Sequence, residues 1–367
     1  MTDLDRQFLR LALELAAKGQ ALASPNPMVG AVVIDQNGDL AGHGFHTYDG
    51  VKHAEIVALD RAGESVRGGT LYVTLEPCSH QGRTGPCSDA IAAAGIRRVV
   101  APLEDGNPDV SGKGFERLRA AGIEVEVAEE FRREAARLNE PFFHYMRTGR
   151  PFVTLKTAAT LDGKIAAPDD NSGWITSGAA RQHVHEVRHG HDAILTGIGT
   201  VLEDDPLLTD RSGIPRRKPL MRIVVDSLCR LPVESQLVAS YDNDLVVMTT
   251  SAAVPKRKEL LEERGVPVHV MDAPLGRVDL RAVIDWAAKE RLLSLMVEAG
   301  AKLNWASLDD GIVDKVLIYY APKILGGLDS LPMAGGIGRR SRSGAIRLHG
   351  LSTFMVGEDE FAVEAYL

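Results

Sequence analysis

Cysteine is scarce in this sequence of 367 residues, which contains only three. Small secreted folds held by disulfides need many more, so that class is excluded. A basic excess is also missing, because 42 Lys and Arg stand against 50 Asp and Glu and leave a net charge of −8. Nucleic-acid-binding proteins usually carry such an excess. We therefore expect a small-molecule substrate and no nucleic-acid partner.

Long apolar runs are missing as well. No stretch approaches the ~20 apolar residues that span a bilayer. The first residues, Thr2 to Asp5, also lack the basic-then-apolar pattern of a signal peptide. We expect a cytoplasmic protein without a membrane partner. We also expect a homo-oligomer, either a dimer or a tetramer.

The length predicts about two domains, at roughly 100 to 200 residues per domain. Helical and strand patterns alternate in both halves, which favours an α/β fold class, with a three-layer α/β domain first. The run Arg147 to Pro151 is the best boundary, so we place the domains at residues 1–146 and 147–367.

Individual elements follow from the hydrophobic pattern. The first half is expected to have helices at 4–15, 53–62, 86–94, 115–121 and 129–139, and strands at 30–35, 40–46, 70–75, 97–101 and 124–127. The second half is expected to have strands at 152–158, 193–196, 222–225, 245–249, 268–271, 293–297 and 315–320, and helices that include 179–189 and 280–289.

A possible metal site is the strongest signal in the first half. His53, Cys78 and Cys87 supply one imidazole and two thiolates, which are three of the four ligands of a catalytic zinc and leave one position for water. Glu55 stands two residues from His53 and is free to move protons. This is the ligand set, with the non-ligand glutamate, of zinc-dependent base deaminases, whose signature is HxE and PCxxC.

The spacing of the two cysteines is unusual, because eight residues separate Cys78 from Cys87 where the pattern has two. The site can still form if Cys78 ends a strand, residues 79–86 loop out and Cys87 begins a helix. A helix N-terminus would favour the thiolate of Cys87. The alternative is two buried structural cysteines and an unrelated histidine.

The run from Thr74 to Cys87, together with His53-Ala54-Glu55, resembles the deaminase half of the bifunctional riboflavin-biosynthesis deaminase/reductase family. The resemblance implies that the segments around Asn26 and Asp105 line the pocket for the pyrimidine and ribose phosphate. It adds these candidate substrate contacts: Asn26, His46, His80, Asp105 and Asn107. Zinc would lower the pKa of a water towards ~7, and Glu55 would carry protons from this water to the ring nitrogen and the departing ammonia.

The second half lacks the GxGxxG fingerprint of a Rossmann domain and offers only Gly197 and Gly199. The strand ending at Glu298 leads into Gly300, where a helix start could expose N–H groups to a phosphate. In order along the chain, these segments resemble the reductase half of the same family. That resemblance implies a cytidine-deaminase-like domain followed by a dihydrofolate-reductase-like α/β domain that uses NADPH.

The resemblance also implies residue roles in the second half. The NADPH contacts would be Ala158, Trp174, Thr200, Asp204, Ser227 and Gly300. The contacts to the ribose-phosphate substrate would be Ser172, Arg188, Leu208, Arg211 and Glu298, and Lys156 is a further ionisable candidate. The forked guanidinium of arginine suits a phosphate. The implied reaction is hydride transfer from NADPH to C1 of the ribosylamino group.

Two alternatives remain open. The first half could deaminate polynucleotide bases, with a C-terminal module that is not catalytic; the acidic balance of residues 1–150, with 17 basic and 21 acidic residues, argues against this. The second concerns His183, His185, His189 and His191, which could form another metal site. No cysteine or well-spaced carboxylate completes that set, so we interpret this segment as a solvated helix.

Overall fold

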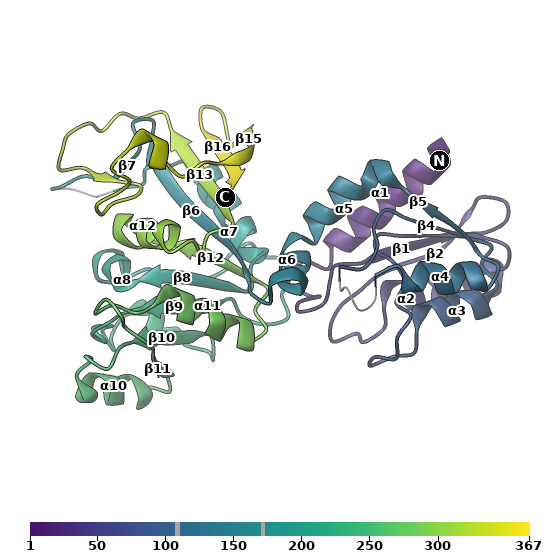
Figure 1. Cartoon of the computed structure of the whole chain (residues 1–367), viewed down its shortest axis with the longest axis horizontal. Helices are drawn as coiled ribbons and strands as arrows, with labels where there is room; N and C mark the ends of the chain where they lie inside the picture. The colour runs from purple at the N-terminus through teal and green to yellow at the C-terminus, as the bar shows by residue number, and fades with distance from the viewer. Residues whose placement is uncertain (107–110, 170–172) are drawn as a thin grey trace. The chain divides into compact units, whose positions relative to one another are not determined.

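The computed structural model describes residues 1–106, 111–169 and 173–367. Its chain forms two compact units (Figure 1), the first being Met1–Gly149 with Pro215–Lys218 and the second being Arg150–Ile214 with Pro219–Leu367. Two candidate contacts, Asn107 and Ser172, lie outside the described residues. Among the described residues, no helix combines the length and the apolar character that a membrane crossing requires.

The first unit is built on a five-stranded mixed sheet. Its strands are β1 (Gly30–Ile34), β2 (Leu40–Phe45), β3 (Thr70–Val73), β4 (Arg98–Ala101) and β5 (Glu124–Val127). They lie in the order β2-β1-β3-β4-β5, with β1 antiparallel to both of its neighbours and β3, β4 and β5 parallel. Because β3 and β4 are parallel, the segments that follow them leave the same edge of the sheet.

Helices cover both faces of this sheet and give the expected three layers. The helices of this unit are α1 (Asp3–Ala17), α2 (Ala54–Ala62), α3 (Cys87–Ala94), α4 (Lys113–Ala120), α5 (Arg132–Leu138) and α6 (Glu140–Thr148). Figure 1 shows α1 and α5 on one face and α2, α3 and α4 on the other. A Cβ on Gly30 would lie 2.0 Å from the carbonyl oxygen of Ala12, so glycine lets α1 pack directly on β1.

The second unit is built on a nine-stranded sheet. Its strands are β6 (Phe152–Thr160), β8 (Ala193–Gly197), β9 (Met221–Val225), β10 (Leu245–Thr249), β11 (Val268–Val270), β12 (Ser294–Glu298), β13 (Lys315–Ala321), β15 (His349–Met355) and β16 (Phe361–Tyr366). The order is β11-β10-β9-β8-β12-β6-β13-β16-β15, and only β16 and β15 are antiparallel to their neighbours. A short pair, β7 (Lys164–Ala166) and β14 (Leu331–Pro332), stands apart.

Helices pack on both faces of the large sheet. They are α7 (Gly178–His189), α8 (Ile198–Asp204), α9 (Gln236–Ala239), α10 (Pro255–Glu262), α11 (Leu280–Lys289) and α12 (Ala301–Asp309). Alternate residues of each strand enter different cores: Leu195 joins α11 residues such as Val283, while Ile194 packs with Val201 of α8. The expected α/β class is therefore confirmed for both units.

Several local expectations are wrong. Residues 129–131 form a 3-10 turn, and α5 begins only at Arg132. Helix α8 at residues 198–204 and the antiparallel strands β15 and β16 were not predicted. Helix α7 forms as expected, but it is not a solvated helix, because His189 is 1% exposed.

Candidate active sites

In the first unit, three potential metal ligands converge from different elements. His53 is the N-cap of α2, Cys87 is the first residue of α3, and Cys78 lies in the irregular segment after β3. The idea that Cys78 ends a strand is wrong, since β3 ends at Val73. The loop before Cys87 and the helix that begins there are as expected, so the long spacing between the cysteines is absorbed by the loop.

The geometry of this cluster fits zinc. His53 Nδ1 lies 3.2 Å from Cys87 Sγ and 3.5 Å from Cys78 Sγ, and the three ligand atoms all lie within 4.8 Å of one another. Tetrahedral zinc with ordinary bond lengths would separate its nitrogen and sulfur ligands by about 3.5 to 3.8 Å. Cys78 and Cys87 are buried, and the Cys87 thiol and His53 hold the pKa of the Cys78 thiol well below its ordinary value. A soft donor set of this kind selects zinc over hard cations.

Glu55 lies in the first turn of α2, two residues after His53. Its side chain is 3% exposed, and burial raises the pKa of its carboxyl group above the usual range. A carboxyl group with a raised pKa is suited to general acid and base work. Its buried position beside the cysteines fits the role expected for Glu55.

His46 and Asn26 form a polar wall beside the cluster. His46 Nδ1 lies 3.0 Å from the carbonyl oxygen of Lys52, and Nε2 lies 3.0 Å from Asn26 Nδ2. Since a carbonyl oxygen only accepts, Nδ1 carries the proton and Nε2 accepts from the amide of Asn26. Burial lowers the pKa of His46, which favours the neutral ring. The two rings of His46 and His53 lie 5.4 Å apart, so this wall adjoins the zinc ligands.

Glu76 is a residue that the motifs did not single out. This buried carboxylate accepts four backbone N–H groups, two on Oε2 from Asp105 and Gly112 at 2.9 Å each, and two on Oε1 from Gly114 and Phe115 at 2.7 and 3.1 Å. It therefore fixes Asp105, a candidate substrate contact, beside the segment that carries Cys78. The only sequence signal was a glutamate placed between a buried strand and the Pro-Cys pair.

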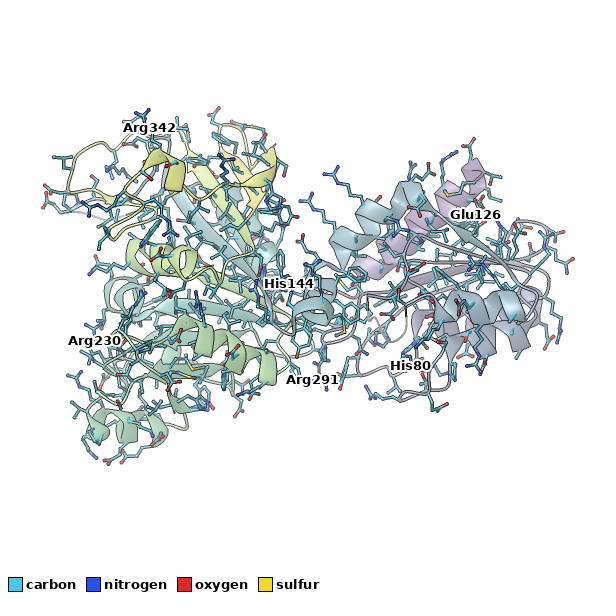
Figure 2. All side chains as sticks on the ribbon, viewed as in Figure 1. His80, Glu126, His144, Arg230, Arg291 and Arg342 are labelled. Carbon is cyan, nitrogen blue, oxygen red and sulfur yellow. The ribbon has the colours of Figure 1, made fainter. Side chains whose placement is uncertain are left out.

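The loop between the two cysteines carries polar residues at the surface. His80, labelled in Figure 2, is exposed. Arg83 donates to the carbonyl oxygen of Tyr48 at 3.0 Å, and its guanidinium lies 4.8 Å from the centre of the Tyr48 ring. Both side chains belong to the same unit as the cluster, at its solvent side.

In the second unit, three predicted residues form a charged cluster on one face of the sheet. Lys156 on β6 and Glu298 on β12 are direct neighbours in the strand register. Lys156 Nζ lies 2.9 Å from Glu298 Oε1, and Arg188 of α7 donates to Glu298 Oε2 through Nε at 3.0 Å and Nη2 at 2.9 Å. The carboxylate therefore holds two cations at fixed positions.

The charges of this cluster are strongly coupled. Although burial raises the pKa of Glu298, the charges of Lys156 and Arg188 and their hydrogen bonds bring it down to about 2. Lys156 and Arg188 are 8% and 7% exposed. Buried cations that share a single carboxylate leave a net positive charge at this point, which suits an anionic substrate.

The candidate NADPH contacts follow the carboxyl ends of parallel strands. Thr200 follows β8, Ser227 follows β9, and Gly300 follows β12 and is the N-cap of α12. A Cβ on Gly300 would lie 3.9 Å from Thr200 Oγ1, so these two residues are adjacent. Ser227 Oγ accepts from the Val278 amide at 3.2 Å. A helix N-terminus at this edge fits the phosphates of a dinucleotide.

The remaining predicted residues of this unit differ in exposure. Trp174 is 70% exposed, and the Arg181 guanidinium lies 4.9 Å from the centre of its ring. Asp204 and Arg211 are exposed, while Ala158 is partly buried and faces the core that contains Tyr319. Leu208 is 4% exposed and has a backbone φ of 52°. A β-region backbone would be easier for leucine, so the chain is held in this conformation by its surroundings.

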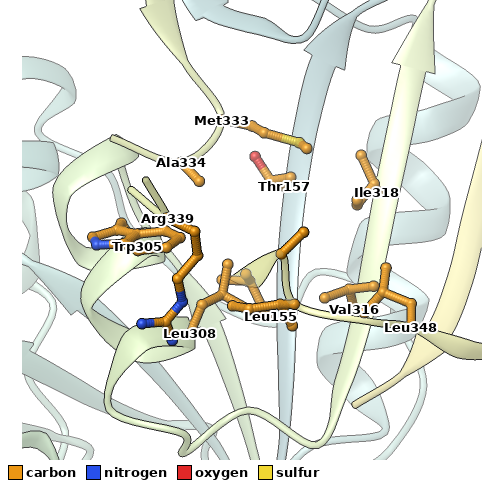
Figure 3. A pocket seen from close by; sticks show the side chains of 12 residues that line it. Leu155, Thr157, Trp305, Leu308, Val316, Ile318, Met333, Ala334, Arg339 and Leu348 are labelled. Atoms are coloured by element: carbon orange, nitrogen blue, oxygen red, sulfur yellow. The ribbon is translucent and has the colours of Figure 1, made fainter. Parts of the chain in front are cut away.

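An apolar cavity of about 320 Å³ lies on the opposite face of the large sheet (Figure 3). Leu155 and Thr157 line it, and they flank Lys156 on β6, so their side chains point away from the charged cluster. Trp305 and Arg339 close one side of the cavity in Figure 3. This cavity is therefore separate from the candidate reductase site.

Comparison with known proteins assigns a family to each half. Residues 2–103 match the cytidine and deoxycytidylate deaminase zinc-binding region. Residues 151–359 match the RibD C-terminal domain. These matches cover the segments that carry the His53, Cys78 and Cys87 cluster and the Lys156, Arg188 and Glu298 cluster.

Whole-chain relatives extend the likeness. The riboflavin biosynthesis protein RibD of Actinobacillus pleuropneumoniae is 41% identical over 359 residues, which are 98% of this chain and 94% of the relative. The structure of Acinetobacter baumannii RibD has a TM-score of 0.87 at 34% identity and covers 99% of this chain and 98% of its own. A Thermotoga maritima diaminohydroxyphosphoribosylaminopyrimidine deaminase/5-amino-6-(5-phosphoribosylamino)uracil reductase has a TM-score of 0.83 at 34% identity, with 99% and 98% coverage.

The fold and the two sites define a class: a zinc-dependent deaminase of the cytidine deaminase type joined to an NADPH-dependent reductase with a dihydrofolate-reductase-like fold. Within this class, the chain belongs to the RibD family, the bifunctional deaminase/reductases of riboflavin biosynthesis.

Proposed function

We propose that the chain catalyses two consecutive reactions on one pyrimidine ribosylamino phosphate. The first is hydrolytic deamination of 2,5-diamino-6-ribosylamino-4(3H)-pyrimidinone 5′-phosphate. The second is NADPH reduction of the ribosyl group, which yields 5-amino-6-ribitylaminouracil 5′-phosphate. Membership of the RibD family and the presence of both clusters support this assignment. We assign the reactions to residues 1–146 and 147–367.

In the deaminase, His53, Cys78 and Cys87 would hold zinc through one nitrogen and two sulfurs. When bound, zinc supplies a Lewis acid that lowers the pKa of a water molecule. Glu55 takes the proton of the attacking water on its carboxylate, donates it to the ring nitrogen, and carries a second proton to the departing ammonia. Asn26 and His46 bind the polar edge of the pyrimidine, and Asp105 and Asn107 the ribose, while His80 contacts the substrate at the rim.

In the reductase, NADPH supplies the hydride when it is bound. Ala158, Trp174, Thr200, Asp204, Ser227 and Gly300 would hold it at the carboxyl edge of the sheet. Ser172, Leu208, Arg211 and Arg188 would hold the substrate, with both arginines at its phosphate. Lys156 is placed by Glu298 to donate a proton to the sugar oxygen as the ring opens, since its ammonium group is buried at a fixed position.

The protein is further proposed to act as a homo-oligomer in the cytoplasm, without a nucleic-acid or membrane partner. Large apolar side chains are exposed between residues 324 and 355, including Ile324 at 72%, Leu328 at 101%, Ile337 at 89% and Leu351 at 64%, and a second copy could cover them. The free thiols of Cys78 and Cys87 favour a reducing compartment. Light scattering coupled to size-exclusion chromatography measures the oligomeric state directly.

The observation that carries the deaminase is the convergence of His53, Cys78 and Cys87 beside Glu55. Its test is ammonia release from the pyrimidine substrate by metal-free protein before and after one equivalent of zinc is added. We expect release only with zinc. Equal release without metal would contradict the assignment, and turnover of an RNA substrate at a comparable rate would favour the polynucleotide alternative.

A further inference from the structure

The last residue of helix α7, His189, forms a buried hydrogen-bonded pair with Asp210, and neither residue has a role in the two proposed reactions. His189 Nδ1 lies 2.8 Å from Asp210 Oδ2, and the two side chains are 1% and 6% exposed. Buried carboxylates are costly unless they are paired and hydrogen-bonded. The pair joins residues 21 positions apart in the chain, so it ties the last turn of the helix to the loop that follows α8.

The direction of the hydrogen bond in this pair follows from the two atoms that form it. Asp210 Oδ2 accepts, so His189 Nδ1 carries the proton that it donates. His189 Nε2 is buried and has no hydrogen-bond partner among the described residues. The geometry therefore gives one buried hydrogen bond, which His189 Nδ1 donates to the carboxylate of Asp210.

The loop that receives this bond is held at several further points. Arg188, the neighbour of His189, donates through Nη1 to the carbonyl oxygen of Thr209 at 3.1 Å. Asp210 Oδ1 accepts from the amide of Ser212 at 2.9 Å, which closes a turn around Arg211. Leu208, two residues before Asp210 in the same loop, has its backbone at φ 52°. The last turn of α7 thus clamps residues 208–212 with two adjacent side chains.

Arg211 is carried by this turn, between Asp210 and Ser212. Burial lowers the pKa of His185, and the charges of Arg188 and Arg211 lower it further. Arg211 itself is exposed, and an exposed arginine has several rotatable bonds to order when it binds an anion. Because the turn at 210–212 already fixes the backbone of Arg211, only its side-chain rotamers remain to be ordered, and the entropic cost of binding is smaller.

We propose that His189 and Asp210 are positioning residues: their pairing fixes the turn that presents Arg211, and thereby sets the affinity of the reductase for the phosphate end of its substrate. This inference rests on the proposed role of Arg211. Neither residue touches the reacting atoms, so the expected signature is a change in KM for the phosphorylated substrate with little change in kcat.

The test compares full-length variants that remove or keep the pair. His189→Leu and Asp210→Ala each remove it, and the double variant removes both groups. His189→Asn is the conservative rescue, because its amide nitrogen stands where Nδ1 stood. His269→Leu, a histidine on the edge strand β11, is the matched control in the same unit. Each variant is assayed with the deaminated intermediate and NADPH, with ammonia release by the first unit as a measure of intact protein.

We expect His189→Leu and Asp210→Ala each to raise KM for the intermediate about 10-fold or more, as for loss of a buried hydrogen bond to a charged group. The double variant should be no worse than either single one, because the two groups act as one unit. His189→Asn should recover most of the wild-type KM, the KM for NADPH should not change, and His269→Leu should match wild type.

The variant Arg211→Gln tests the proposed phosphate contact of Arg211 separately from the positioning role of His189 and Asp210. If Arg211→Gln leaves KM for the intermediate unchanged, the phosphate role of Arg211 is wrong and the inference fails with it. If Arg211→Gln raises KM but His189→Leu and Asp210→Ala do not, only the positioning role is wrong. A loss of kcat at unchanged KM, or failure of both single variants to fold, would also overturn the proposal, because either result would give the pair a different task.

Discussion

Glu55 in the first unit and Glu298 in the second are glutamates shielded from water at their sites, yet their surroundings differ. Burial raises the pKa of Glu55, with no arginine or lysine in contact among the described residues. Lys156 and Arg188 overcome the same effect at Glu298 and bring its pKa to about 2. The surroundings of the first carboxyl group favour its protonated form, and those of the second favour its charged form. The same residue type is thus suited to proton transfer in one site and to holding cations in the other, according to which cations reach it.

A third cluster shows what an ion pair does away from a site. Asp5 of α1 accepts from Arg98 of β4 at 2.8 and 3.0 Å and from the hydroxyl of Tyr72 at 2.8 Å. Glu126 of β5, labelled in Figure 2, also contacts Arg98. Although burial opposes it, hydrogen bonds from Arg98 hold the pKa of Asp5 well below its usual range. In both this cluster and that of Glu298, basic side chains lower the pKa of a carboxyl group. The Asp5 cluster, however, ties α1 to the sheet and contains no candidate substrate contact.

The largest expected effect is at Glu55. Glu55→Gln keeps the volume of the side chain but cannot carry a proton, so ammonia release should fall by about 100-fold to 10,000-fold, the usual contribution of general acid and base catalysis. Zinc content and reduction of the deaminated intermediate should stay at wild-type values. Metal analysis and the two separate assays check this; activity within a few-fold of wild type would remove Glu55 from its role.

The next effect is at Glu298. Glu298→Gln leaves Lys156 and Arg188 without their shared carboxylate, so both cations should shift and reduction should slow by about 10- to 100-fold, the scale expected for loss of charged hydrogen bonds. Ammonia release should not change, because it belongs to the other unit. Steady-state kinetics of each reaction in the same preparation make the comparison, and an equal loss of both activities would show a general folding defect instead.

The pH dependence of stability should also separate the two glutamates. Because the folded pKa of Glu298 lies below its ordinary value of 4.5, its pairing stabilises the fold above pH 4.5, and this contribution is lost as pH falls towards about 2. The difference in free energy of unfolding between wild type and Glu298→Gln should therefore have its maximum value at pH 7 and be close to zero near pH 2. Urea titrations at several pH values measure it. A difference that persists at the lowest pH would mean that packing, and not charge, is responsible.

The smallest expected effect is at Tyr72. Tyr72→Phe removes one of the hydrogen bonds to Asp5 while Arg98 still pairs with it, so the first unit should lose about 1 kcal/mol of stability. Neither activity should change at a temperature where the variant is folded. Thermal unfolding followed by circular dichroism tests this. A loss of ammonia release without a change in stability would mean that the Asp5 cluster acts on the site after all.

Local motifs were the best guide to the deaminase site. His53, Cys78 and Cys87 stand in short patterns whose chemistry is recognisable from residue type, and the structure gathers them although Cys78 lies beyond the end of its strand. Glu76 could not be predicted, because its four bonds go to residues 29 to 39 positions away. Only the parallel order of β3 and β4 makes those segments neighbours.

Contacts in the reductase unit depend more on the order of the strands in the sheet than on local sequence motifs. Lys156 and Glu298 were both named as candidates, but their contact follows from the pairing of β6 with β12, whose residues lie 142 positions apart. The pair of His189 and Asp210 was missed because it joins the end of a helix to a loop 21 positions further along the chain. The helix, which is rich in histidine, was interpreted as solvated. The fold class could be predicted from alternating helices and strands, whereas the antiparallel β15 and β16 at the end of a parallel sheet could not.

The account's central claim is that one chain holds two sites that work on successive substrates without sharing residues. Its most direct test is to give Glu55→Gln, in one preparation, first the diaminopyrimidine substrate with NADPH and then the deaminated intermediate. We predict no ammonia release and no NADPH oxidation with the first substrate, followed by NADPH oxidation at the wild-type rate with the second. Failure to oxidise NADPH with the intermediate, in protein that is folded and contains zinc, would contradict the claim.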